Sequence, residues 1–162
     1  MSLQNQAKLS DSDSNPSDAA HFNSGSRNSL DLVDILSVVD ETAYTWNLET
    51  GRIQWESNAR TVLNLQGDEV IDTADAYQSL IAAEHLHRHS NLLAEARTKF
   101  AEGGQADAKK GVAYRAQYRI QTGTRGGTKD IWLEDHGRWW PAIGDEAEHA
   151  RGVIRVINEN YW

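Results

Sequence analysis

Two groups of polar side chains in this sequence have types and spacings that could carry chemistry. His85 and His89 lie four residues apart in a stretch with helical periodicity, so they share one helix face, a spacing that suits two ligands of zinc or nickel. Glu134, Asp135 and His136 are adjacent in a predicted strand. Because neighbouring side chains on a strand point to opposite faces, Glu134 and His136 share a side and could form an acid–base pair.

Each group also has a simpler structural interpretation. A metal site needs a third ligand and the sequence nominates none, so His85 and His89 remain weak candidates beside a solvated helix start that carries histidines. For Glu134 and His136 we favour a polar network between strands on an exposed face. The glycine-rich segment 123–129 lacks the Walker spacing and indicates a hairpin turn. We therefore assign no catalytic residue and no metal, and expect this chain not to be an enzyme.

Charge and composition restrict the class of protein. The 162 residues carry 24 acidic and 16 basic side chains, a net charge of −8, which argues against nucleic-acid binding. The mean hydropathy of −0.65 and the lack of a long apolar run predict no membrane span, and the N-terminus has no apolar signal region. Cysteine is absent, so disulfides, thiolate zinc ligands and cysteine nucleophiles are excluded. We expect a cytoplasmic module.

The N-terminal part divides into two segments. Residues 1–28 are rich in Ser, Asp and Asn and poor in apolar side chains, which predicts a disordered arm. Residues 29–41 form a leading amphipathic helix in which apolar residues at i, i+3, i+4 and i+7 share a face. This face either packs on its own domain or pairs with a second copy, and we take the same residues as candidates for a dimer interface: Leu32, Ile35, Leu36 and Val39.

The remaining periodicity predicts an α+β domain. Two short strands, 43–47 and 52–56, are separated by a turn at 48–51, and a short helix from about 59 to 65 is closed by Gly67. Asp75 is the expected cap of a second short helix. A longer helix spans about 84–101, and strands follow at 114–121, 130–140 and 152–157. Five antiparallel strands with helices on one face of the sheet, preceded by an N-terminal helix, is the expected fold.

Four stretches in this order resemble the PAS sensory family, in particular its aromatic-rich bacterial branch. They are Tyr44–Trp55, Tyr118–Ile120, Ile131–Arg138 and Arg151–Ile154, and in the family they lie on the opening hairpin and on the third, fourth and fifth strands. The resemblance covers roughly residues 30–159. It places a PAS-like sensor domain at 42–159 and the start of an exit linker, which we expect to be truncated, at 160–162.

Two segments depart from the family pattern. The family usually has a His-Pro-Asp-Asp-like turn before its long helix, where this chain has Ala82-Ala83-Glu84-His85. Its last strand usually ends in an Asp-Ile-Thr-like exit, where this chain has Asn158-Glu159-Asn160. The resemblance therefore implies the fold more directly than it implies how a signal leaves the domain.

The resemblance implies a small pocket between the sheet and the long helix. As pocket candidates we name Tyr114, Tyr118, Trp132 and Arg155. It also implies a regulatory module that binds a small ligand or dimerises to control an attached C-terminal output domain, either a histidine kinase or a cyclic-di-GMP-metabolising enzyme. Without cysteine, neither the flavin adduct nor the thioester chromophore of PAS photosensors can form. Haem would need an axial ligand such as His85, His87 or His89 and is not favoured, nothing points to non-covalent flavin, and the cofactor is left unassigned.

Two other functions remain open from the sequence. One is an interaction or homodimerisation module whose pocket is filled by its own side chains. The other is a small α+β enzyme of the cone-shaped isomerase type, with His136 and Glu134 as acid and base, which requires these two residues to be paired and buried.

Overall fold

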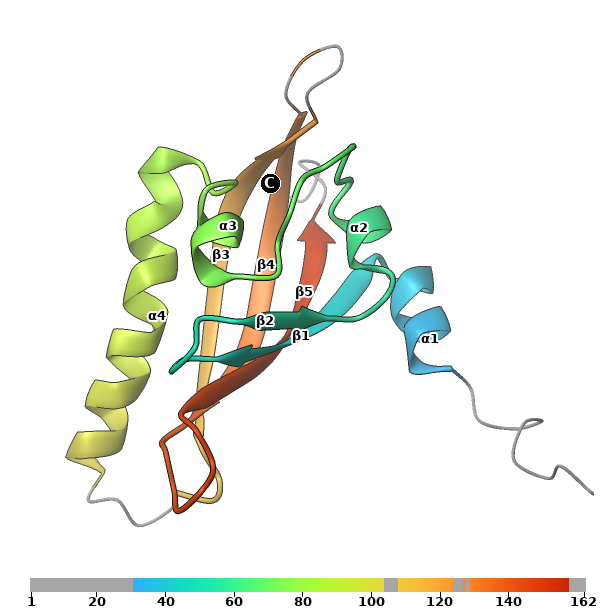
Figure 1. The fold of residues 1–162 in the computed structure, drawn as a ribbon. Coiled ribbons are helices and arrows are strands. Elements are labelled where there is room, and N and C mark those ends of the chain that lie inside the picture. Colours follow the sequence, from blue (N-terminus) through green and yellow to red (C-terminus); the bar gives the residue numbers. More distant parts are fainter. Residues whose placement is uncertain (1–30, 104–107, 124–126, 128, 158–162) are drawn as a thin grey trace, which may run out of the picture.

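The computed structural model describes residues 31–103, 108–123, 127 and 129–157, and in them a five-stranded antiparallel sheet has the order β2-β1-β5-β4-β3 (Figure 1). The strands are β1 (Glu41–Asn47), β2 (Ile53–Trp55), β3 (Val112–Thr122), β4 (Lys129–Trp140) and β5 (His149–Ile157). The helices are α1 (Leu32–Val38), α2 (Ala59–Val62), α3 (Ala74–Gln78) and α4 (Ala83–Glu102). The predicted α+β class and its five antiparallel strands are confirmed.

The two faces of the sheet follow from strict alternation along its strands. Side chains at every second position are buried and point toward the helices, while those between them face the other side. The buried positions of β1 and β4 are Thr42, Tyr44, Trp46, Ile131, Leu133, Asp135 and Trp139. We call the side that carries these residues the inner face, and the opposite side the outer face.

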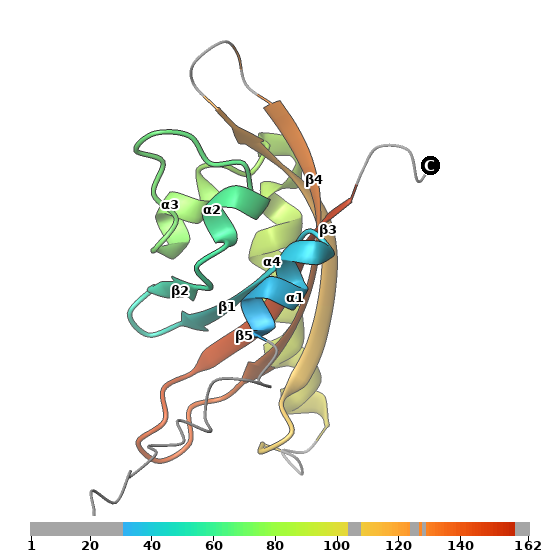
Figure 2. The same cartoon turned by 90° about the vertical axis from the view of Figure 1, so that its right-hand side faces the viewer.

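The helices α2, α3 and α4 lie on the inner face (Figure 2). The start of α3 differs from the expectation, because the hydroxyl of Thr73, rather than Asp75, accepts the capping hydrogen bond from the Ala76 N–H. The long helix α4 buries His89, Leu92, Leu93 and Ala96. Among the described residues, no helix is both long and apolar enough to cross a membrane.

The segment that enters α4 covers part of the free edge of β3, the outermost strand on this side of the sheet. The Ala82 N–H donates to the Arg119 carbonyl, and the Gln121 N–H donates to the Leu80 carbonyl. The Arg119 N–H in turn donates to Nδ1 of His85, at 3.0 Å. These bonds satisfy backbone groups that would otherwise form an open sheet edge.

The leading helix is shorter than the predicted span of 29–41, because its ends are set by Asp31 and Asp40. The Asp31 side chain accepts from the Val33 N–H at the N-terminus, and Asp40 has a φ of 54°, which turns the chain into β1. The predicted arm of residues 1–28 lies outside the described residues, as does the exit linker.

A buried amide joins α1 to the sheet. The Asn58 side chain donates to the Ser37 hydroxyl and the Glu41 carbonyl, and it accepts from the Thr42 hydroxyl at 2.8 Å. Two residues beyond the end of α1, the Asp40 carbonyl accepts a hydrogen bond from the N–H of Val156, near the end of β5. The entry to the domain and the end of its last strand are therefore hydrogen-bonded neighbours.

Candidate functional site

A carboxyl group and four tyrosines form a hydrogen-bonded cluster inside the domain. Asp135 of β4 accepts from the Tyr44 hydroxyl at 2.9 Å on one oxygen and from the Tyr118 hydroxyl at 3.2 Å on the other. The Tyr44 hydroxyl lies 2.5 Å from that of Tyr114, and the Tyr118 hydroxyl lies 2.8 Å from that of Tyr77. Asp135 is thus the centre of a chain of hydroxyls contributed by β1, β3 and α3.

Two glycines give the tyrosine rings room on the sheet. Gly137 is the register partner of Tyr114, and Gly152 is the partner of Tyr44. A Cβ atom at Gly152 would lie 2.6 Å from Cζ of Tyr44, and one at Gly137 would overlap the Tyr114 ring. Each ring therefore lies across the neighbouring strand at a position where only glycine fits.

A small internal cavity adjoins the cluster. Its open space is about 10 Å³, roughly enough for one water molecule. Two atoms of residues in its wall, Nε1 of Trp46 and Nδ1 of His89, are buried and have no hydrogen-bond partner among the described residues. Ile154 of β5 completes a wall formed by Tyr44, Trp46, Ile53, Trp55, Tyr77, His89, Asp135 and Ile154.

The His89 ring is enclosed by aromatic side chains. Its centroid lies 5.9 Å from that of Trp46, 5.8 Å from Tyr77 and 5.2 Å from Tyr118. Burial lowers the pKa of His89 to about 4, so the imidazole is neutral at physiological pH. The neutral ring has one nitrogen that donates and one that accepts a hydrogen bond.

Burial also controls the charge of the cluster. It raises the pKa of Asp135 to about 7, against the opposing effect of the hydrogen bonds from Tyr44 and Tyr118. Burial raises the pKa of the four tyrosine hydroxyls as well, so all of them stay protonated. Asp135 is the member of this cluster whose charge changes near neutral pH.

Glu134 and His136 lie on the outer face and form a polar network with β3. One Glu134 oxygen accepts from Arg115 at 2.8 Å and from Gln117 at 2.7 Å, and the other is 2.6 Å from His136 Nε2. These contacts, led by the one to Arg115, lower the pKa of Glu134 to about 2. The predicted pair is formed, but the His136 side chain is 51% exposed, so the buried pair that the isomerase hypothesis requires is not present.

The two histidines with metal-ligand spacing lie in different environments. His85 accepts a backbone hydrogen bond from β3, and its ring lies 5.0 Å from that of Trp132, whereas His89 is inside the core. The described residues contain no group of three or more His, Cys, Asp or Glu arranged to hold a metal ion.

Of the four predicted pocket residues, the structure brings two together. Tyr114 and Tyr118 are members of the cluster on the inner face. Trp132 and Arg155 are separated from it, because both occupy outward positions of their strands. Trp132 lies against His85 at the β3 side of the sheet, and the guanidinium of Arg155 is 4.0 Å from Glu41. Trp132 and Arg155 are therefore corrected to outer-face residues.

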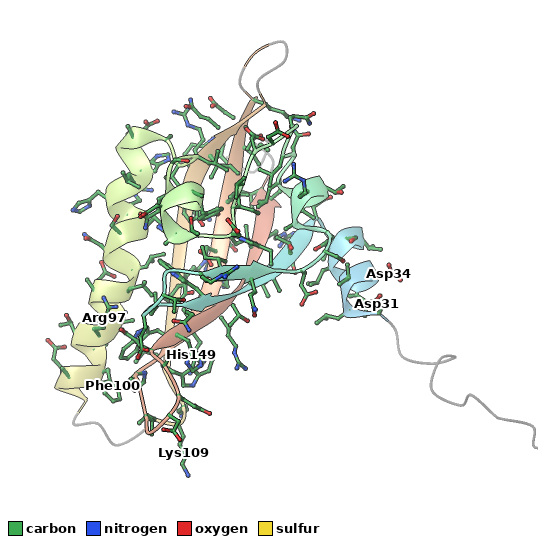
Figure 3. The ribbon with its side chains drawn as sticks, in the orientation of Figure 1. Asp31, Asp34, Arg97, Phe100, Lys109 and His149 are labelled. Carbon is green, nitrogen blue, oxygen red and sulfur yellow. The ribbon has the colours of Figure 1, made fainter. Side chains whose placement is uncertain are left out.

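The predicted dimer residues on α1 also separate into two groups. Leu36 is buried at 7% exposure, so it packs within its own domain and is removed from the candidate interface. The other three remain exposed, together with Val38, whose exposed fraction is 84%. Figure 3 shows α1, with Asp31 and Asp34, at the side of the domain opposite α4. The exposed apolar residues of α1 and its C-cap are Leu32, Ile35, Val38 and Val39.

Four residues of the site were not predicted as such: Tyr44, Tyr77, His89 (considered as a metal ligand only) and Asp135. Signals for two of them are present in the sequence. His89 precedes Leu92 and Leu93 by three and four residues, which places it on the apolar stripe of its helix. Asp135 alternates with Leu133, so an inward Leu133 requires an inward Asp135.

Comparisons with known proteins address the fold. No family model matches this sequence, and no curated protein does. The PAS domain of a protein from Colwellia psychrerythraea superposes with a TM-score of 0.50 at 12% identity, over 79% of this chain and 95% of that one. The chain has the PAS fold.

Other solved structures with lower scores include PAS-containing signalling proteins. A sensory box histidine kinase/response regulator from Burkholderia thailandensis matches with a TM-score of 0.47 and 17% identity, over 77% of this chain and 82% of that one. The N-terminal domain of a diguanylate cyclase with a PAS/PAC sensor from Marinobacter aquaeolei matches with 0.46 and 15%, over 72% and 94%. In this PAS-fold domain, the Asp135 cluster lies between the sheet and the helices α3 and α4.

Proposed function

We propose that this PAS-fold domain is a non-catalytic, cytosolic regulatory module that senses a small polar molecule in the cavity beside Asp135. Binding there would shift the population between two arrangements of the sheet, and an attached output domain would respond. The family resemblance points to a histidine kinase or a cyclic-di-GMP-metabolising enzyme as that output domain.

The observation that carries this proposal is the pair of unpartnered polar atoms in the cavity wall. A buried donor or acceptor without a partner costs roughly 1–3 kcal/mol, so a molecule that bonds to Trp46 Nε1 and His89 Nδ1 recovers this free energy. The open space holds about one water molecule, so a compound of several atoms, such as formamide, requires the tyrosine rings to move. The ligand is expected to be neutral and to offer both a donor and an acceptor.

Titration with formamide tests the sensing site. We expect saturable shifts of the Trp46 indole N–H resonance in ¹⁵N-labelled protein, because this N–H lacks a partner among the described residues. Trp46→Phe lacks this resonance, so its binding is followed on the backbone amides of the cavity wall, and it is expected to be about tenfold weaker, the effect of one lost hydrogen bond. Trp140→Phe is the matched control, since the Trp140 indole donates to the Lys109 carbonyl instead. A linear, unsaturable response, or equal binding by both variants, would contradict the proposal.

A second candidate function is homodimerisation without a ligand, and the exposed face of α1 favours it. Three large apolar side chains on a seven-residue helix, and a fourth at its C-cap, remain in contact with solvent. A second copy of the same helix is a self-complementary partner for this surface, because a two-fold axis places identical apolar residues opposite each other.

Charge introduction on α1 tests dimerisation. Ile35→Asp is expected to convert a dimer into a monomer in sedimentation equilibrium, because a carboxylate would be buried at the contact. Val70→Asp is the control, since Val70 is similarly exposed but lies outside α1. Deleting residues 29–39 should have the same effect as Ile35→Asp. A dimer that survives both changes would exclude α1 as the interface.

A further inference from the structure

A polar groove lies on the outer face of the sheet, on the side opposite Asp135. Its volume is about 450 Å³, within the range of small-molecule sites. Strand residues form its floor, and the β1–β2 turn and the connection between β4 and β5 form its walls. The lining residues are Thr45, Asn47, Thr50, Arg52, Gln54, Glu146, Ala147, His149 and Arg151.

The strand register explains why two arginines line the same groove. Thr45 is the register partner of both Gln54 and Arg151, and Asn47 is the partner of His149. The Asn47 N–H donates to the Arg52 carbonyl, so Arg52 lies beside Asn47 on the side of β1 opposite His149. Arg52 and Arg151 are therefore on opposite sides of β1, with Cα atoms roughly 12 Å apart. Both side chains line the groove, and Arg151 would leave the Trp140 ring to share one anion with Arg52.

The groove is cationic in a protein whose net charge is −8. Its lining contains two arginines against a single carboxylate, that of Glu146. Within the described part of the chain, neither Arg52 nor Arg151 forms a side-chain hydrogen bond or ion pair. The Arg151 guanidinium lies 5.8 Å from the centre of the Trp140 ring, which also stacks on His149 at 5.1 Å.

Hydrogen bonds within each wall and to neighbouring residues hold the walls of the groove in place. Oδ1 of Asn47 accepts from the N–H groups of Glu49 and Thr50 and fixes the β1–β2 turn. Glu148 fixes the other wall, because one of its oxygens accepts from Arg97 at 2.5 Å and from Trp139 at 2.8 Å. Figure 3 labels Arg97 on α4 and His149 on β5, both in the lower half of the view. Preorganised walls reduce the entropy lost when a ligand binds.

We propose that this groove binds a small molecule that carries a phosphate group. Two guanidinium groups and the hydroxyls of Thr45 and Thr50 are the hydrogen-bond donors of the groove. A carboxylate has two oxygens to accept from them, whereas a phosphate has three and matches this set of donors better. The planar ring of His149, which lines the groove beside Arg151, favours a flat group attached to the phosphate. This site is separate from the cavity beside Asp135 and does not depend on its ligand.

Calorimetric titration with phenyl phosphate, benzoate and inorganic phosphate tests this site. Phenyl phosphate should bind saturably and more tightly than either of the other two compounds. Its advantage over benzoate measures the preference for phosphate over carboxylate, and its advantage over inorganic phosphate measures the contribution of the flat ring. Arg52→Gln and Arg151→Gln should each weaken phenyl phosphate binding roughly tenfold or more, the effect of losing one charged hydrogen bond. Arg88→Gln is the matched control, because Arg88 is an exposed residue of α4 outside the groove.

Three results would overturn the proposal. Absence of saturable binding would exclude the site, and equal weakening by Arg88→Gln would reveal attraction to overall charge alone. Dissociation of a dimer by Arg52→Gln or Arg151→Gln in sedimentation equilibrium would show that the groove receives an acidic segment of a second copy instead. Both arginines are exposed, and unchanged thermal unfolding of the variants checks that binding is lost without loss of the fold.

Discussion

Replacing Asp135 with Asn is expected to turn a nearly flat dependence of stability on pH into one that rises by about 3 kcal/mol between pH 4 and pH 6.5. The expectation rests on two buried groups, Asp135 and His89, whose pKa values are displaced in opposite senses relative to the unfolded chain. In the unchanged protein their contributions to the pH dependence oppose each other, and removing one reveals the other.

The sign of each contribution follows from proton binding. Asp135 has a pKa of about 7 when folded and about 4 when unfolded, so the folded state binds more protons between these values. Its contribution to stability therefore falls, by about 4 kcal/mol, as the pH rises from 4 to 7. His89 has a pKa of about 4 when folded and about 6.5 when unfolded, so its contribution rises with pH over that interval.

Urea denaturation at pH values from 4 to 8 measures these profiles. Asp135→Asn keeps the shape of the protonated carboxyl. In this variant the free energy of unfolding should rise with pH, because only the contribution of His89 remains. In His89→Leu the free energy of unfolding should fall with pH, because only the contribution of Asp135 remains. Asp68→Asn is the control, because Asp68 is exposed. Profiles of the two core variants that run parallel to that of the unchanged protein would show that neither group has the displaced pKa.

Gly137→Ala is expected to destabilise the domain by about 2–3 kcal/mol. The new methyl group would occupy the space of the Tyr114 ring, which must move and give up its hydrogen bond to Tyr44. The displaced ring has little free space to enter, because the open cavity nearby holds only about 10 Å³. The midpoint of urea unfolding gives the change in stability.

A double-variant cycle distinguishes this steric cause from a general loss of strand flexibility. In a Tyr114→Leu background the ring is absent, and Gly137→Ala should cost much less than in the unchanged protein. The difference between the two costs is the coupling between positions 114 and 137. Additive effects would mean that the ring and the glycine do not constrain each other. The same cycle applies to Gly152 and Tyr44, whose register is equivalent.

The order and type of the elements could be predicted from periodicity because each element carries its own pattern. The alternation from Tyr114 to Gln121 predicted a strand that the structure extends to Val112–Thr122. The long helix, predicted from 84 to 101, spans Ala83–Glu102. The ends of short elements depend on single side chains, and the choice between Thr73 and Asp75 as a cap could not be made from residue type, since both are good caps.

The site was less predictable because it depends on which face of each element turns inward. The triplet Glu134-Asp135-His136 has three polar residues in sequence, and only the position of Leu133 decides that the middle one is buried. Similarly, the stripe on α1 identifies a helix face but not how much of it its own domain covers. Burial of Leu36 and exposure of Ile35 are tertiary effects that appear once the helix is placed against β1.

The hydrogen bond between the Asp40 carbonyl and the Val156 N–H has a consequence for how such a domain can be joined to others. Because the chain enters and leaves the sheet at the same corner, the domain can be inserted into a loop of a host protein without separating the two ends of that loop. Rotation of one flanking segment would also move the other, because the two are joined by this hydrogen bond. A circularly permuted variant that links these two points by a few glycines should therefore fold, with new termini at the β1–β2 turn.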